Sequence, residues 1–310
     1  MKSTIVYKPY KVALVALDLT EMDDRLIQYS SMMARLLPLE RIFFVHVAKD
    51  LALPTDLLEE YPDLVGPLDE SIETDIQNKI DRYFDATNDV RVECIIKEGN
   101  PIDKILKLCR IKDVDLIFMG RKRSLHGSGI ASSGIARKCP CSLFLVTEDS
   151  KLQLKEALVP VDFSDHSGLA MKQAIEAQSN NGFKLSAMHV YSVPSGYHKT
   201  GKSYAEFSEI MKSHAKKDFK KFMESNGFPA DIACKYILTD DSKYANLAYE
   251  FAEKQDADLI IIGSKGRTSV SSILIGSVAE KLVYVDSHIP VLIVKSKGEN
   301  MGFLDALLKI

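Results

Sequence analysis

Short apolar runs alternate along the chain with longer segments whose apolar residues recur at helical spacing. In the second half, the pattern predicts strands at 157–161, 185–190, 232–237, 259–262 and 291–294, and helices at 167–178, 204–225, 244–254 and 277–286. The predicted strands are continuously apolar, which indicates a sheet covered on both faces. Strands that alternate with helices predict an α/β fold with a doubly wound parallel sheet.

The two halves of the chain repeat each other. VALVALDLTEMDD at 12–24 corresponds to EALVPVDFSDHS at 156–167, and DVDLIFMGRKR at 113–123 corresponds to DADLIIIGSKG at 256–266. The copies are collinear, so each is predicted to be a domain of ordinary size. We therefore predict a first domain at 1–150, a second at 151–298, and an apolar C-terminal tail at 299–310.

A glycine-rich loop follows the predicted strand at 259–262. Its pattern is G-x2-G-x9-G-S, formed by Gly263, Gly266 and the Gly276-Ser277 pair. Glycine permits positive φ angles and lets a ligand approach bare backbone. A helix predicted to begin beside Ser277 offers unpaired N–H groups and a positive dipole end, which suit phosphate. Ser264 adds a hydroxyl group, and Lys265 and Arg267 add positive charge.

This loop resembles the nucleotide loop of the universal stress protein family. ALVPVDFSDHSGLAMKQA, MHVYSV and HIPVLIVK are similar to that family's first, second and closing strands with their flanks, so the chain looks like a tandem member. The resemblance implies an adenine nucleotide alpha hydrolase-like, Rossmann-like fold that binds ATP, or AMP or ADP, possibly with Mg²⁺. It implies that the nucleotide lies in the second copy against Pro160, Val161, Asp162, Val190, Gly263, Ser264, Gly266, Arg267, Gly276, Ser277 and Val278.

Simpler structural roles compete with several of these assignments. The loop could be an ordinary strand-to-helix connection with Ser277 as the helix N-cap. Asp162 could cap the turn that follows its strand, and Val190 could simply pack in the core. His46 and His189 recur at matching positions, but neither has a metal-ligand partner at useful spacing, so we interpret both as structural.

The first copy departs from the loop pattern. Gly120 is present, but Arg123 stands where the second glycine belongs, and the intervening segment is shorter. We predict that this copy binds no ATP in the family manner. Arg121, Lys122 and Arg123 could attract another anion, but we favour a solvated basic turn. The first copy has a Gly-x-Pro turn at 99–101, and the second copy has no such turn at the corresponding position. Asp240 and Asp241 lie there instead, and their charge would weaken phosphate binding unless Mg²⁺ bridges them.

Composition narrows the functional classes. The chain has 310 residues, is 46% hydrophobic and carries a net charge of −3, which disfavours nucleic-acid binding. Its five cysteines are irregularly spaced, which favours reduced thiols in a cytoplasmic protein. We see no secretory signal in the N-terminal residues and no apolar run long enough to span a bilayer, so no membrane association is expected.

Three functional hypotheses remain at this point. The first is a regulatory nucleotide-binding protein of the stress response, which acts through ligand-linked changes in population. The second is a weak ATP hydrolase with Asp162 or Asp241 as base or metal ligand, although no catalytic arrangement stands out, so an enzyme is not our first expectation. The third is an interaction scaffold with vestigial sites. The resemblance also implies an intramolecular pseudo-dimer of the two copies, with a homodimer possible.

Overall fold

The computed structural model describes residues 7–51, 68–85, 89–121, 129–241, 243–267, 274–285, 287–299 and 301–302. These residues form two compact units. The N-terminal unit comprises Lys8–Leu152 together with the residues from Lys297 onward, and the C-terminal unit comprises Gln153–Ser296 together with Tyr7. Each unit contains one copy of the sequence repeat.

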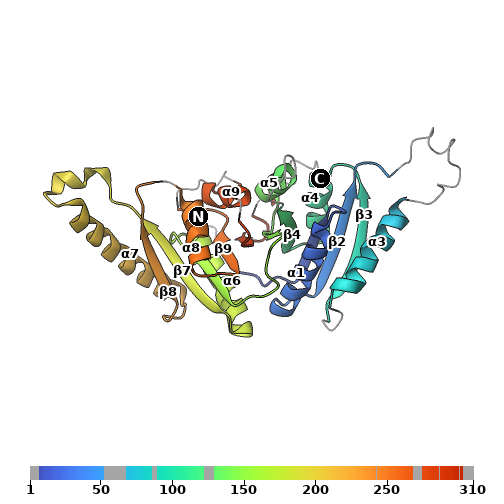
Figure 1. Cartoon of the computed structure of the whole chain (residues 1–310), viewed down its shortest axis with the longest axis horizontal. Helices are drawn as coiled ribbons and strands as arrows, with labels where there is room; N and C mark the ends of the chain where they lie inside the picture. Colours follow the sequence, from blue (N-terminus) through green and yellow to red (C-terminus); the bar gives the residue numbers. More distant parts are fainter. Residues whose placement is uncertain are drawn as a thin grey trace. The chain divides into compact units, whose positions relative to one another are not determined.

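The N-terminal unit is a five-stranded parallel sheet with helices between the strands (Figure 1). The strand order is β3-β2-β1-β4-β5, and all four pairings are parallel. Its elements are β1 (Val12–Leu17), α1 (Met22–Leu36), β2 (Arg41–Ala48), α3 (Leu68–Tyr83), β3 (Arg91–Glu98), α4 (Pro101–Ile111), β4 (Leu116–Arg121), α5 (Gly129–Lys138) and β5 (Ser142–Thr147).

The C-terminal unit repeats this arrangement. Its strand order is β10-β9-β6-β7-β8, again with parallel pairings. Its elements are β6 (Glu156–Pro160), α6 (Asp165–Asn181), β7 (Lys184–Tyr191), the 3₁₀-helix η1 (Ser195–Thr200), α7 (Tyr204–Asn226), β8 (Ala233–Leu238), α8 (Tyr244–Lys254), β9 (Leu259–Gly263), α9 (Ser277–Tyr284) and β10 (Val291–Val294).

Both units therefore have a Rossmann-like α/β fold with a topological switch point. In the C-terminal unit, the chain direction across the sheet reverses between β6 and β9. Right-handed crossovers then place α6 and α7 on one face of the sheet and α8 and α9 on the other. Gly168 of α6 lies against Phe222 of α7, and α8 contacts α9, as this arrangement requires. Ligands of such sheets bind beyond the carboxyl ends of the strands at the switch point.

The hydrophobic pattern predicted these elements well. The bounds of α8 and β10 match the prediction, and the other strands and helices of the C-terminal unit agree to within a few residues. Continuous burial of β9 and β10 confirms that both faces of the sheet are covered. Ile210 of α7 is apolar but 39% exposed, so it lies outside the buried face of this helix.

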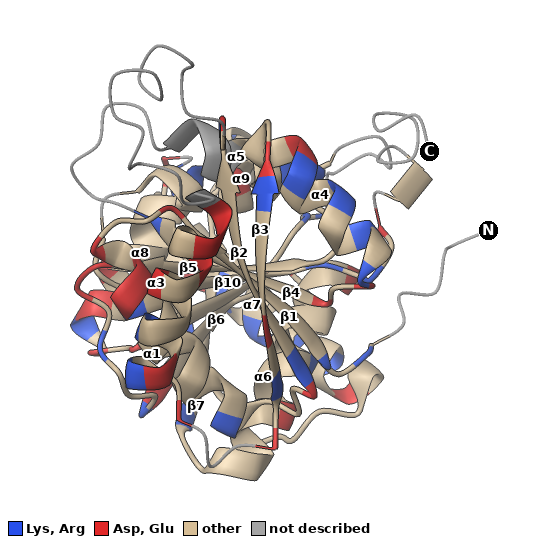
Figure 2. Cartoon of the chain, turned by 90° about the vertical axis from the view of Figure 1, so that its right-hand side faces the viewer, with Lys and Arg blue, Asp and Glu red and all other residues tan. Residues whose placement is uncertain are grey.

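Polar residues lie mainly outside the sheet. Lysine, arginine, aspartate and glutamate gather on helices such as α3 and α4 and at the ends of strands (Figure 2). The five cysteines are free thiols, and Cys139 and Cys141 are buried. Within the described ranges, no helix combines the length and the apolar character needed to cross a membrane. Most of the predicted C-terminal tail at 299–310 lies outside the described residues, as do residues 52–67.

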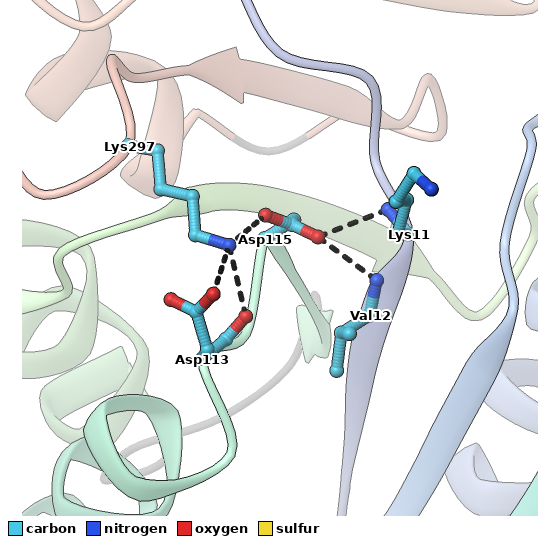
Figure 3. Close-up of polar contacts among 5 residues, drawn as sticks. All are labelled: Lys11, Val12, Asp113, Asp115 and Lys297. Atoms are coloured by element: carbon cyan, nitrogen blue, oxygen red, sulfur yellow. Dashed lines mark hydrogen bonds and ion pairs between the residues drawn. The ribbon is translucent and has the colours of Figure 1, made fainter.

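The buried carboxylate of Asp115 links the start of β1 to Lys297, which rejoins the N-terminal unit after β10 (Figure 3). Asp115 Oδ2 accepts hydrogen bonds from the backbone N–H groups of Lys11 and Val12, both at 2.9 Å. Its Oδ1 lies 2.6 Å from Nζ of Lys297, which also contacts Asp113 Oδ2 at 2.8 Å. Burial would lower the pKa of Lys297, but the hydrogen bonds to both carboxylates outweigh it and raise the pKa.

We expect Lys297→Ala to destabilise the N-terminal unit by about 2 kcal/mol, because it removes charged hydrogen bonds from a carboxylate whose side chain is only 7% exposed. The backbone N–H groups of Lys11 and Val12 still hold Asp115, so the loss should be smaller than for an unpartnered buried charge. Urea denaturation followed by hydrogen exchange at β1 measures the effect. Lys11→Ala removes only an exposed pair with Glu40 and should cost less than about 0.5 kcal/mol. Equal effects of the two substitutions would contradict this account.

Candidate functional site

A pocket of about 290 Å³ opens in the C-terminal unit at the carboxyl ends of β6, β7 and β9. This is the switch point at which sheets of this kind bind ligands. Its volume is at the lower end of the range for small-molecule sites. The pocket lining includes every site residue nominated from the sequence: Pro160, Val161, Asp162, Val190, Gly263, Ser264, Gly266, Arg267, Gly276, Ser277 and Val278.

Asp162 joins the end of β6 to the glycine-rich loop. Its Oδ1 accepts hydrogen bonds from the backbone N–H of Ser164 at 3.1 Å and from the Ser164 hydroxyl at 2.6 Å. Its Oδ2 accepts from the backbone N–H of Arg267 at 2.9 Å. Asp162 therefore caps the turn after its strand, as the simpler interpretation held, and also fixes the position of the loop.

Close contacts with backbone or side-chain atoms explain the three loop glycines. A Cβ on Gly263 would lie 2.5 Å from the carbonyl oxygen of His166, and one on Gly266 would lie 2.8 Å from Asp162 Oδ2. A Cβ on Gly276 would lie 3.2 Å from Ser264 O, to which the Gly276 N–H donates at 2.7 Å. None of the three has a positive φ angle, so the positive φ that glycine permits is not used at these positions.

Helix α9 presents its first turn to the pocket. Gly276 is the N-cap and has an extended backbone, and Ser277 is the first helical residue, so the interpretation of Ser277 as N-cap was wrong. The first helical hydrogen bond runs from Glu280 N–H to Gly276 O. The N–H groups of Ser277, Val278 and Ala279 thus precede the helical ladder and offer donors to an anion.

His189 has a structural role beneath the pocket. Its Nδ1 lies 2.8 Å from the Val161 carbonyl oxygen, and its ring stacks on Phe163 with centroids 4.2 Å apart. Burial lowers the pKa of His189. A neutral imidazole that faces a carbonyl must carry its proton on Nδ1, so His189 donates to the strand end. His46 makes the corresponding contact with Leu17 O at 3.1 Å, which supports the structural interpretation of both histidines.

The N-terminal copy places different chemistry at the same positions. Asp23 corresponds to the pocket-lining Ser167, is fully buried, and accepts hydrogen bonds from the backbone N–H groups of Asp18 and Leu19 at 3.0 and 2.9 Å. Arg121, which corresponds to Ser264, is only 7% exposed, so its assignment to a solvated basic turn was wrong. A buried carboxylate at this strand end disfavours an anionic ligand. Lys122, Arg123 and the rest of that loop lie outside the described residues.

The buried carboxylate of Asp23 makes the stability of the N-terminal unit depend on pH. Burial raises the pKa of Asp23 to about 6 from an ordinary value of 3.8, although the Asp18 backbone N–H lowers it. The folded state therefore binds this proton more tightly than the unfolded state does. The resulting stabilisation of the folded state is complete below about pH 3.8 and is lost as pH rises through about 6. We expect a loss of about 2 kcal/mol between pH 4 and pH 6.

Hydrogen exchange at β1, corrected for the intrinsic exchange rate, tests this expectation. The difference in unfolding free energy between the wild type and Asp23→Asn should change by about 2 kcal/mol over that pH range. The amides of β6 in the same samples serve as an internal control and should show no such change. Parallel pH profiles of the two proteins at β1 would contradict the assignment.

The structure adds residues that the sequence reasoning did not nominate. Ser167, Met188, His189, Tyr244, Ala248, Ile262 and Ala279 also line the pocket, together with the secondary candidate Lys265. Asp240 and Asp241 do not line it. Asp240 accepts a hydrogen bond from the Tyr204 hydroxyl at 2.6 Å, and Asp241 pairs with Lys243 at 3.0 Å.

The described part of the pocket offers little to a metal ion alone. Asp162 is the one carboxylate among its described lining residues. No cluster of three or more histidine, cysteine, aspartate or glutamate residues suited to a metal occurs within the described ranges. These residues fit a Mg²⁺ ion that is held mainly by the phosphates of a nucleotide, which is a common arrangement for this ion.

Comparison with known proteins identifies the family. The family model described as the universal stress protein family matches residues 9–147 and, separately, residues 154–295. The chain belongs to this family. It is a tandem member, because each copy of the repeat matches the family on its own.

Individual relatives agree with this assignment. The universal stress protein MJ0531 of Methanocaldococcus jannaschii is 34% identical over 144 residues, which are 46% of this chain and 82% of that protein. The crystal structure of a universal stress protein from Archaeoglobus fulgidus has a TM-score of 0.64 at 20% identity, covers 92% of this chain and is itself 98% covered. Another universal stress protein has been solved in complex with cAMP. It is 14% identical to this chain with a TM-score of 0.33, and the match spans 45% of this chain and 98% of that protein.

Proposed function

We propose that this tandem universal stress protein is a regulatory protein of the stress response that binds an adenine nucleotide in its C-terminal copy. The ligand would be ATP, or AMP or ADP, with Mg²⁺ carried on its phosphates. One observation carries the proposal. The switch-point pocket brings together the end of β6, the glycine-rich loop and the first turn of α9.

The lining of the pocket supports this proposal. The apolar residues Val161, Met188 and Val190 line the side formed by β6 and β7, where a base can be buried. The loop and the N–H groups at 277–279 line the other side, where backbone donors and the helix dipole favour phosphate. Lys265 and Arg267 add positive charge on that side. The ribose would then lie near Asp162, between the two.

A weak ATP hydrolase ranks second because Asp162, its candidate base, already accepts hydrogen bonds at both oxygens. Both oxygens of Asp162 are engaged, by Ser164 and by the backbone of Arg267. Asp241, the other candidate, does not line the pocket. We therefore favour a mechanism in which the nucleotide increases the population of the conformation or assembly that binds it more tightly. Pairing of the two copies and formation of a homodimer remain predictions.

Two measurements test the proposed function. Mass spectrometry of the purified chain should identify a co-purified adenine nucleotide. Calorimetric titration of the nucleotide-free protein with ATP, ADP and AMP, with and without Mg²⁺, should show one site per chain, because only the C-terminal copy has the loop. Absence of binding at millimolar concentration would overturn the proposal, and two sites per chain would overturn its assignment to one copy. Release of inorganic phosphate at many turnovers per minute would favour the hydrolase.

A further inference from the structure

We infer that Tyr244 is a specificity residue that stacks on the base of the bound nucleotide. The inference rests on the proposed function and deepens it. Tyr244 is the first residue of α8 and lines the pocket while remaining 40% exposed. Ala248, one helical turn later, lines the same wall and is buried. An aromatic ring thus stands at the rim of a pocket whose inner wall is apolar.

The sequence repeat shows that the tyrosine is not needed to build the helix. Helices α4 and α8 are corresponding elements of 11 residues each, and Pro101 occupies the position of Tyr244. In α4, Asn100 caps the helix by accepting hydrogen bonds from the backbone N–H groups of Ile102 and Asp103 at 3.0 and 3.3 Å. Proline in the first turn and an asparagine cap are both favourable features of a helix start.

Helix α8 begins without these features. Its N-cap is Lys243, which makes no side-chain capping hydrogen bond. An asparagine cap stabilises the start of a helix, and α8 lacks one while its first residue, Tyr244, leaves 40% of its surface exposed. A local departure from good helix design without structural compensation is the pattern expected at a functional position. The feature that distinguishes this position from its counterpart is that Tyr244 lines the pocket.

The position of Tyr244 in the pocket indicates which part of the ligand the ring would contact. Tyr244 and Ala248 belong to α8, whereas the phosphate donors belong to the loop and to α9. The ring lacks positive charge, so it suits the planar base and not the phosphates. Stacking of a base on an aromatic side chain contributes about 1–3 kcal/mol, as measured by alanine substitution. The ligand class is therefore a nucleotide with an extended planar base.

Calorimetry with two ligands tests the inference. ATP carries the base, and inorganic tripolyphosphate carries the phosphates alone. We expect Tyr244→Ala to weaken ATP binding by about 10-fold and to leave tripolyphosphate binding unchanged. Tyr244→Phe keeps the ring and should stay within about 2-fold of the wild type for both ligands. Tyr284→Ala is the matched control, because Tyr284 is 56% exposed and does not line the pocket.

The possible failures are distinguishable. If the wild type binds ATP and Tyr244→Ala binds it equally well, the stacking role is overturned and the proposed function stands. If Tyr244→Ala loses ATP and tripolyphosphate to the same extent, the residue supports the fold of α8 and the stacking role is again overturned. If the wild type binds neither ligand, the proposed function and this inference fall together.

Discussion

Replacement of Gly276 with aspartate should lower the affinity of the C-terminal copy for ATP by at least about 100-fold. Gly276 is the N-cap of α9, at the end of the pocket that we assign to the phosphates. Two unit charges about 4 Å apart near a protein surface interact by about 4 kcal/mol, and the triphosphate carries several charges. A carboxylate there would also accept hydrogen bonds from the first N–H groups of α9 and compete with the phosphate for them. Calorimetric titration with ATP measures the change.

Two further substitutions separate charge from bulk. Gly276→Asn has nearly the size and shape of the aspartate variant without its charge, and Gly276→Ala adds only a methyl group. The alanine Cβ would lie 3.2 Å from Ser264 O and from Lys265 Cα, so the loop must give slightly and affinity should fall by less than about 10-fold. The aspartate variant should bind more weakly than the asparagine variant, and the gap should narrow at high salt. Equal affinities of these two variants would refute a phosphate at this position.

The fold could be predicted from the sequence largely because hydrophobic periodicity is local. The apolar runs of β9 and β10 and the helical spacing in α8 give their bounds almost to the residue. The order of the strands was not predictable from the pattern, since a continuously apolar strand shows that it is covered but not which strands lie beside it. The repeat added information, because it required both units to have the same order, as they do.

The sequence predicted which residues line the candidate site but not the contacts that they make. The loop motif indicated the pocket-lining glycines, yet the reason for glycine is contact with His166, Asp162 and Ser264 and not backbone handedness. The contacts of Gly263 with His166 and of Gly266 with Asp162 join residues about 100 positions apart, which no local pattern records. Tyr244 was missed because the first residue of a helix shows no periodicity. Its signal was the comparison with Pro101 in the other copy.

Replacement of Gly263 with alanine should destabilise the C-terminal unit by about 3 kcal/mol or more. Its Cβ would lie 2.5 Å from the carbonyl oxygen of His166 and 2.6 Å from the carbonyl carbon. These atoms belong to the first turn of α6, so the whole helix start must move away from β9. Overpacking of this kind typically costs about 1–3 kcal/mol, and more where backbone is the obstacle. Urea denaturation followed by hydrogen exchange at β9 measures the loss.

The N-terminal copy provides the matched control, because Gly120 holds the corresponding position at the end of β4. A Cβ on Gly120 would lie 2.6 Å from Cγ of Met22, which is the flexible side chain of the residue corresponding to His166. A side chain can shift more easily than the backbone of α6, although Met22 is buried. Alanine also lowers the conformational entropy of the unfolded chain, which favours folding by about 0.4–1 kcal/mol. Gly120→Ala should therefore cost less than Gly263→Ala. If the two substitutions destabilise their units equally, close packing against α6 does not explain Gly263, and its place beside the ligand becomes the better reason for glycine.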